Sequence, residues 1–254
     1  MAQHQNEKKL LTIASGKGGV GKTWLSITLS QILAHQGKNI ALFDGDLGLA
    51  NVDIQLGLAP DYDLSSVITG DKGLKDIISR YSEKDGSGFD VIPGQSGTGA
   101  LGALSKDALV GLRTKLCDLA DDYDRVLLDL AAGIDPSVTT LSQHDGTLLV
   151  VMTGDPTSLT DAYALIKVTA TRNPKADIRV VVNNVPDKAA GEKAFGAIKR
   201  ACEGFLKVSP QLAGIVRTDP KVVDAIRHQI PLATRHPGAT AVADIKALAR
   251  ELFA

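Results

Sequence analysis

Short runs of aliphatic residues recur along the chain, each apolar throughout rather than alternating with polar residues. Continuous runs of this kind are typical of strands that are covered on both faces of a sheet. The predicted strands are Leu10–Ala14, Ile40–Phe43, Phe89–Ile92, Val126–Leu130, Leu148–Met152, Ile178–Val182 and Leu212–Val216.

Longer stretches with helical periodicity separate these runs. They are Leu25–Ala34, Lys106–Leu119, Leu159–Thr169, Ala194–Leu206, Val222–His228 and Ala241–Ala254. The alternation predicts an α/β fold, a doubly wound and mostly parallel sheet with helices on both faces. The Gly- and Ser-rich segment 81–104 is interpreted as a strand bracketed by loops. Because no repeat or linker interrupts the pattern, we expect one domain over residues 1–254.

Composition narrows the class of protein. The chain is 44% hydrophobic, which excludes wholesale disorder. Its 28 basic and 29 acidic residues nearly balance, which argues against a protein that coats nucleic acid by bulk charge. Cys117 and Cys202 lie far apart in sequence and predict neither a disulfide framework nor a metal site. No apolar run has the length of a membrane span, and the first residues do not resemble a signal peptide. We therefore expect a cytoplasmic protein that binds no specific nucleic acid.

The first predicted strand is followed directly by the sequence S-G-K-G-G-V-G-K-T. From Gly16 to Thr23 it satisfies the phosphate-loop pattern G-x-x-x-x-G-K-[ST] between a strand and a helix. Glycines let backbone N–H groups converge on a triphosphate, Lys22 reaches its β- and γ-phosphates, and the Thr23 hydroxyl binds Mg²⁺. The predicted nucleotide contacts in this loop are Gly16, Lys17, Gly18, Gly19, Val20, Gly21, Lys22 and Thr23.

Acidic residues occur at or near the ends of two further predicted strands. Asp44 and Asp46 come at the end of the second run, and Asp129 lies within the fourth, in a Walker B pattern. Carboxyl ends of parallel strands border the crevice where such sheets bind ligands. Asp129 is therefore predicted to hold Mg²⁺, and of Asp44 and Asp46 one could lie near the metal and the other near an attacking water.

The motif K-G-G-x-G-K-[ST] resembles the deviant Walker A motif of the MinD/ParA ATPases. The resemblance implies a slow, Mg²⁺-dependent ATPase in which Lys17 reaches the nucleotide of a second copy across an ATP-dependent homodimer. It further implies that Asp46 positions the hydrolytic water, with Lys17, Lys22 and Asp46 as the catalytic set and Asp44 as a supporting group near the metal.

Two more motifs extend this resemblance. The segment 129–134, D-L-A-A-G-I, is similar to the family switch D-x-x-A-G-I, which implies that the Gly133 backbone N–H senses the γ-phosphate. Asn183 aligns with an asparagine that hydrogen-bonds adenine, and the loop ending at Pro220 is similar to the segment that packs against the base.

The segment 44–57, D-G-D-L-G-L-A-N-V-D-I-Q-L-G, resembles the FlhG/FleN branch of the family, which regulates flagellar number. A protein of flagellar assembly is the regulatory partner that this implies. The alternatives are a MinD-like division-site regulator and a ParA-like partition ATPase. A small-molecule kinase or ligase and a non-hydrolysing nucleotide scaffold also stay open.

Two features fit the resemblance less well. Trp24 replaces the small polar residue usual after the loop threonine, and we expect it to pack as a helix residue against the sheet. The last predicted helix places Val242, Ile245 and Leu248 on one face, but its acidic residues offset its basic ones. We therefore expect that helix to dock on the domain, with weak peripheral contact to the inner face of the cell membrane as the other interpretation.

Overall fold

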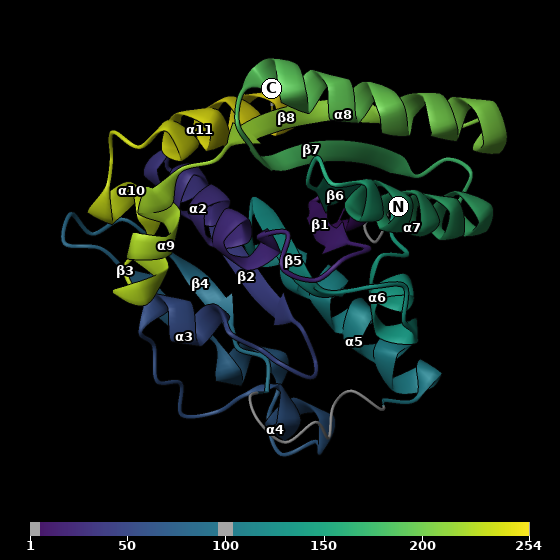
Figure 1. The fold of residues 1–254 in the computed structure, drawn as a ribbon. Coiled ribbons are helices and arrows are strands. Elements are labelled where there is room, and N and C mark those ends of the chain that lie inside the picture. Colours follow the sequence, from purple (N-terminus) through teal and green to yellow (C-terminus); the bar gives the residue numbers. More distant parts are fainter. Residues whose placement is uncertain (1–5, 96–103, 254) are drawn as a thin grey trace.

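A computed structural model of the chain describes residues 6–95 and 104–253. Its strands form one eight-stranded sheet in the order β3-β4-β2-β5-β1-β6-β7-β8, in which only β3 pairs antiparallel to its neighbour (Figure 1). The strands are β1 Leu10–Ser15, β2 Ile40–Gly45, β3 Ser79–Ser82, β4 Gly88–Ile92, β5 Arg125–Ala132, β6 Thr147–Met152, β7 Asp177–Val185 and β8 Gln211–Arg217. The predicted fold class is confirmed.

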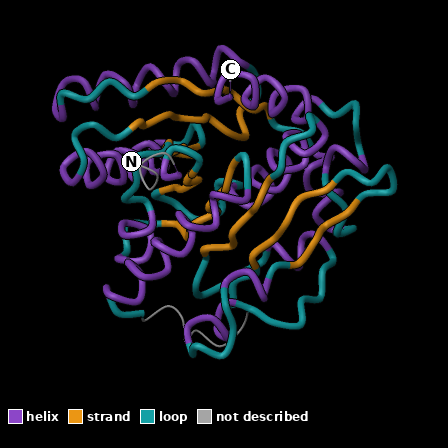
Figure 2. Tube along the Cα trace, turned by 180° about the vertical axis from the view of Figure 1, so that it is seen from behind, coloured by secondary structure: helices purple, strands orange, loops and turns teal. Residues whose placement is uncertain are grey.

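Helices cover both faces of this sheet (Figures 1 and 2). Residues of α2 and α11 pack in one apolar cluster, and residues of α5, α6, α7 and α8 pack in the other. The helices are α2 Lys22–His35, α3 Val52–Leu56, α4 Leu64–Ile68, α5 Lys106–Leu119, α6 Pro136–Leu141, α7 Pro156–Arg172, α8 Lys188–Ala201, α9 Pro220–Arg227, α10 Leu232–Arg235 and α11 Thr240–Phe253. Short 3₁₀ turns at Leu74–Ile77 and Ala120–Asp122 and a π turn at Cys202–Leu206 complete the described elements.

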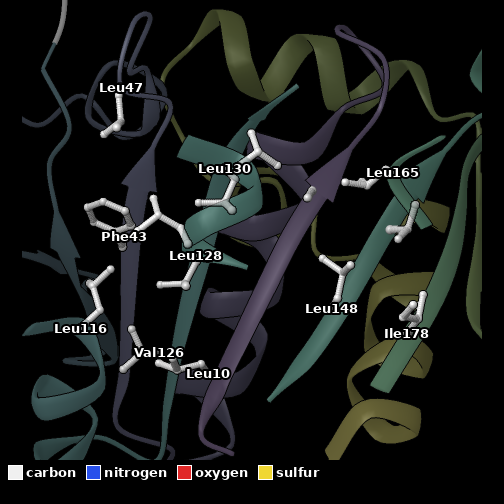
Figure 3. Close-up of a cluster of buried hydrophobic side chains, with 14 of the residues drawn as sticks. Leu10, Phe43, Leu47, Leu116, Val126, Leu128, Leu130, Leu148, Leu165 and Ile178 are labelled. Carbon is white, nitrogen blue, oxygen red and sulfur yellow. The ribbon is translucent and has the colours of Figure 1, made fainter. Parts of the chain in front are cut away.

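Alternate residues of each central strand point into opposite clusters. In β1, Leu10 and Ala14 belong to the cluster on one face, and Leu11 and Ile13 belong to the cluster on the other. Figure 3 shows the first cluster, in which Leu10 is drawn with side chains from several neighbouring strands. This two-sided burial explains why the strands read as continuous apolar runs.

All seven predicted strands are present, but the segment 81–104 contains residues of two strands where one was predicted. β4 is the expected strand, whereas the first two residues of the segment belong to β3, a hairpin partner at the edge of the sheet. Burial in β3 alternates between intermediate and exposed, so no apolar run marks it. Residues 96–103, where a loop was predicted, lie outside the described part of the chain.

The helix α11 docks on the domain, as the sequence favoured. Val242, Ile245 and Leu248 are almost completely buried in the cluster that α2 and β8 share. The apolar face that could have met a membrane is therefore occupied by protein. Among the described residues no helix is long and apolar enough to cross a bilayer.

One buried polar contact links β1 to the turn before β6. The backbone N–H of Gly146 donates to His144 Nδ1 (3.0 Å), so the ring proton lies on Nε2, which is 2.6 Å from Thr12 Oγ1. Burial, with a smaller effect of Arg113 and against the attraction of Asp145, lowers the pKa of His144 from 6.5 to about 4. The native state thus holds this imidazole neutral.

The protein should therefore lose stability in acid partly through His144. Its unfolded state binds a proton below pH 6.5 that the native state takes up only near pH 4, so this contribution is full above pH 6.5 and is lost as the pH falls. The displacement of the pKa corresponds to about 3 kcal/mol of unfolding free energy. Urea unfolding at pH 7 and pH 4 measures how much unfolding free energy the protein loses on acidification. The loss in His144→Asn should be smaller than in the unaltered protein by about that amount. Equal losses in the two proteins would contradict a neutral, buried His144.

Candidate nucleotide-binding site

The loop between β1 and α2 lies at the centre of the sheet edge, because β1 lies between β5 and β6. Gly21 caps α2 with φ +91°, a left-handed conformation that favours glycine. The amide Nδ2 of Asn183, at the end of β7, donates to the carbonyl of Val20 at 2.7 Å. The loop is thus fastened to the strand that borders the other end of the cleft.

The two basic side chains of the loop lie in different surroundings. Lys22 Nζ donates to Ser15 Oγ at 2.9 Å, and burial lowers the pKa of Lys22 although the charges of Asp129 and Asp46 act to raise it. Lys17 Nζ instead donates to Thr157 Oγ1 at 2.9 Å, near the start of α7. Lys22 lines the cleft near the carboxylates of Asp129 and Asp46, whereas Lys17 is not among the residues that line it.

Asp129 of β5 is a buried carboxylate beside the phosphate loop. It accepts hydrogen bonds from Thr23 and from Ser26 Oγ (3.1 Å), and burial raises its pKa to about 6 against the influence of these hydroxyls and Lys22. Hydroxyl and carboxylate oxygens of this kind are donors that Mg²⁺ prefers. The residues present therefore fit a magnesium ion, with Thr23 and Asp129 as its predicted holders.

Asp44 and Asp46 have different environments despite their spacing. Asp44 is 1% exposed, and its carboxylate accepts backbone N–H groups from Asp46, Asn51 and Val52. Burial and the neighbouring Asp129 charge raise its pKa to about 7. Asp44 thus holds the segment that follows β2, and its predicted contact with the metal stays a prediction.

Asp46 is only partly buried and lines the cleft, as a group facing an attacking water must. Its Oδ1 accepts the backbone N–H groups of Leu49 (3.0 Å) and Gly48 (3.4 Å), which fix the turn. The other carboxylate oxygen has no hydrogen bond within the described part of the chain.

The segment after β5 is bonded to the phosphate loop. The backbone N–H of Gly133 donates to the carbonyl of Ser15 at 2.8 Å, where β1 ends. Gly133 has φ +106°, so an L side chain would be strained there. The residue predicted to sense the γ-phosphate therefore already contacts the strand that leads into the loop.

The cleft has a volume of about 550 Å³ and joins the phosphate loop to the predicted base end. Asn183 and Pro220 both line it. With its Nδ2 committed to Val20, Asn183 presents an Oδ1 that is buried and has no hydrogen-bond partner. A buried acceptor left unpaired is costly, and the exocyclic amine of adenine is a donor that would satisfy it.

The sequence did not predict the ion pair that holds the end of the cleft where the base is expected to bind. Arg217, at the end of β8, lines the cleft and forms a two-pronged ion pair with Asp244 of α11 (2.9 Å and 2.8 Å). Asp244 also accepts the Arg217 backbone N–H, and Asp219 Oδ2 accepts the N–H of Ala241. These residues lie more than 20 positions apart, so no local motif could reveal the pairing.

A larger hollow of about 950 Å³ lies between α5, α6 and α7. His144, Arg113 and Arg172 line it, but no part of the phosphate loop does. The assignment of the nucleotide cleft therefore rests on its donors and acceptors and not on size.

These features define a P-loop nucleotide-binding protein. Residues 11–232 match the CobQ/CobB/MinD/ParA nucleotide binding domain, and the chain belongs to this family. It is 34% identical to the antiactivator FleN of Pseudomonas aeruginosa over 96% of this chain and 86% of that protein. It is 31% identical to the flagellum site-determining protein YlxH of Helicobacter pylori over 76% of this chain and 63% of that one.

Solved structures agree with the fold. The cell division ATPase MinD of Pyrococcus furiosus superposes with a TM-score of 0.79 at 23% identity, covering 96% of this chain and 98% of that one. A chain of the MinC:MinD cell division protein complex of Aquifex aeolicus gives a TM-score of 0.77 at 26% identity, covering 96% of this chain and 95% of that one. The resemblance read from the sequence is thus confirmed at the level of family and fold.

Proposed function

We propose that the protein is an ATPase switch that dimerises with ATP and regulates the number or placement of flagella. The observation that carries the proposal is the grouping of Lys22, Asp129 and Asp46 beside the phosphate loop, with Lys17 bonded to Thr157 and outside the lining of the cleft. The likeness to an antiactivator named FleN and to a flagellum site-determining protein supports the flagellar process. A protein of flagellar assembly is the regulatory partner we expect.

In this proposal the cleft works by positioning and charge. Loop N–H groups and Lys22 hold the phosphates, and Asp46 orients a water for in-line attack on the γ-phosphorus. Mg²⁺, held through Thr23 and Asp129, would neutralise charge on the β- and γ-phosphates. Turnover is expected to be slow, since the outcome of the reaction is a change of partner.

Hydrolysis must also be reported to the surface. The Gly133 N–H that donates to Ser15 is the group expected to meet the γ-phosphate, so ATP would have to draw it away from Ser15. Loss of the γ-phosphate would let the bond to Ser15 form again. Two alternative acceptors for one N–H give the segment after β5 two discrete positions, which a switch requires.

Lys17→Ala should abolish ATP-dependent dimerisation while changing nucleotide affinity less than about threefold, since Lys17 does not line the cleft of its own chain. Light scattering with saturating ATP and Mg²⁺ measures the dimer fraction. Thr157→Ala is the matched control, because it removes the 2.9 Å contact of Lys17 within the chain but keeps the lysine. An unchanged dimer fraction in Lys17→Ala would disprove the role across the interface.

The cellular process is tested by deleting the gene in its host and counting flagella by electron microscopy. Altered number or placement with normal division supports the proposal. Minicells with normal flagella would favour a division-site regulator. The chain is also 28% identical to the septum site-determining protein MinD of Bacillus subtilis, which is the reason to test that alternative. A partition ATPase would instead bind DNA with strong salt dependence.

The family is nucleotide-binding, and two further classes differ from our proposal in chemistry. A small-molecule kinase or ligase would consume ATP only with its metabolite, and a scaffold would bind ATP without releasing phosphate. Phosphate release measured with the protein alone separates both from an ATPase switch.

We also propose that the protein acts in the cytoplasm without strong membrane attachment, because the apolar face of α11 is buried. Liposome sedimentation with ATP and with ADP tests this. ATP-dependent pelleting would show that α11 is released or that another surface meets lipid.

A further inference from the structure

Trp24 lies where the phosphate loop meets the predicted base end. A Cβ placed on Gly21 would come within 2.4 Å of Trp24 Nε1 and 2.6 Å of Asn183 Nδ2. The N–H edge of the indole is thus adjacent to both the loop and the asparagine whose acceptor is unpaired. The sequence predicted only that this residue would pack against the sheet.

The indole is only partly committed to packing. Trp24 packs on the apolar cluster that contains α2, and it borders a small space of about 20 Å³ together with Val222 and Ile226 of α9. The same three residues line the nucleotide cleft, so the indole and α9 form adjoining walls. Trp24 is only partly buried, and no residue of the described part of the chain accepts a hydrogen bond from its Nε1.

We propose that Trp24 is a nucleotide-contacting residue, which forms a wall of the nucleoside half of the cleft and touches the base or ribose of bound ATP or ADP. Its aromatic surface offers the stacking contact that nucleobases accept, and its free N–H is a donor for a nucleoside oxygen. This inference rests on nucleotide binding within the proposed function and needs neither dimerisation nor hydrolysis.

The protein carries its own reporter for this contact. Trp24 is the one tryptophan of the sequence, so all tryptophan emission comes from this site. Titration with ADP and Mg²⁺ should change that emission with the same midpoint as binding measured by calorimetry. Binding without any change in emission would overturn the proposal, whereas absence of binding would instead remove the nucleotide site itself.

Variants separate a nucleoside contact from support of the loop. Trp24→Thr should weaken ADP binding about tenfold, the effect of losing one aromatic contact to a base, and Trp24→Phe should keep most of the affinity. Affinity for inorganic tripolyphosphate, which has no nucleoside, should change less than about twofold in either variant. Equal losses for ADP and tripolyphosphate, or no loss for either, would overturn the proposal.

Phe205→Ala is the matched control, because Phe205 is an aromatic side chain that is 82% exposed and lines no part of the cleft. Thermal unfolding without ligand identifies variants that fold poorly. If Trp24→Thr does not fold, Trp24→Phe and the emission of the unaltered protein still decide the question.

Discussion

Lys22→Ala should weaken the binding of ATP and of ADP by roughly a hundredfold, the largest effect on affinity that we expect from a single side chain. Lys22 is the ammonium group that faces Asp129 and Asp46. Its removal deletes a charged hydrogen bond to phosphate and also leaves two carboxylates to repel the triphosphate. Titration with a fluorescent ATP analogue measures the loss.

Lys17→Ala serves as the comparison within the same loop. It removes the same charge and the same kind of side chain at a position that does not line the cleft, so bulk electrostatics cannot explain a difference between the two variants. Comparable affinities in the two variants would contradict the division of labour between these lysines. Unfolding by urea verifies that neither change acts through stability.

Asp46→Ala should lower the rate of ATP hydrolysis by about a hundredfold or more while leaving ATP affinity within a few-fold. Because the ATP state then persists, the variant should accumulate as a dimer. Phosphate release and light scattering on the same sample measure both effects. A monomer at saturating ATP and Mg²⁺ would contradict the switch.

The alanine change also removes the acceptor for the N–H groups of Gly48 and Leu49. Asp46→Asn keeps a carbonyl oxygen at that position and removes only the charge, so it should lose hydrolysis as well if the carboxylate orients water. Asp53→Ala removes a neighbouring carboxylate that bonds the N–H of Ile54, and it should hydrolyse ATP normally.

The central strands were predictable because burial on both sheet faces leaves a mark in consecutive residues. β3 leaves no such mark at the edge, where Arg80 is half exposed and pairs with Asp90 across the hairpin. The helices that escaped prediction, such as α3 and α10, have four or five residues, too few for a helical period to appear.

The residues of the site likewise fall into those that the sequence predicts and those that it does not. The phosphate loop and Asp129 lie in contiguous motifs, so spacing alone places them at one edge of the sheet. Spacing treated Asp44 and Asp46 as a pair, but the environment separates them, since Asp44 bonds three backbone N–H groups. Trp24 and Asp244 acquire their positions only through tertiary packing, which one sequence does not encode in any local pattern.

The ion pair between Arg217 and Asp244 affects how the protein can be labelled. Because α11 carries the carboxylate that fixes the end of β8, a fluorescent protein fused after residue 254 would be attached to a helix that supports the nucleotide cleft. A fusion that fails to localise could then reflect lost nucleotide binding rather than a lost partner. Imaging studies should therefore place the label elsewhere, or first show that the fusion binds ADP like the untagged chain.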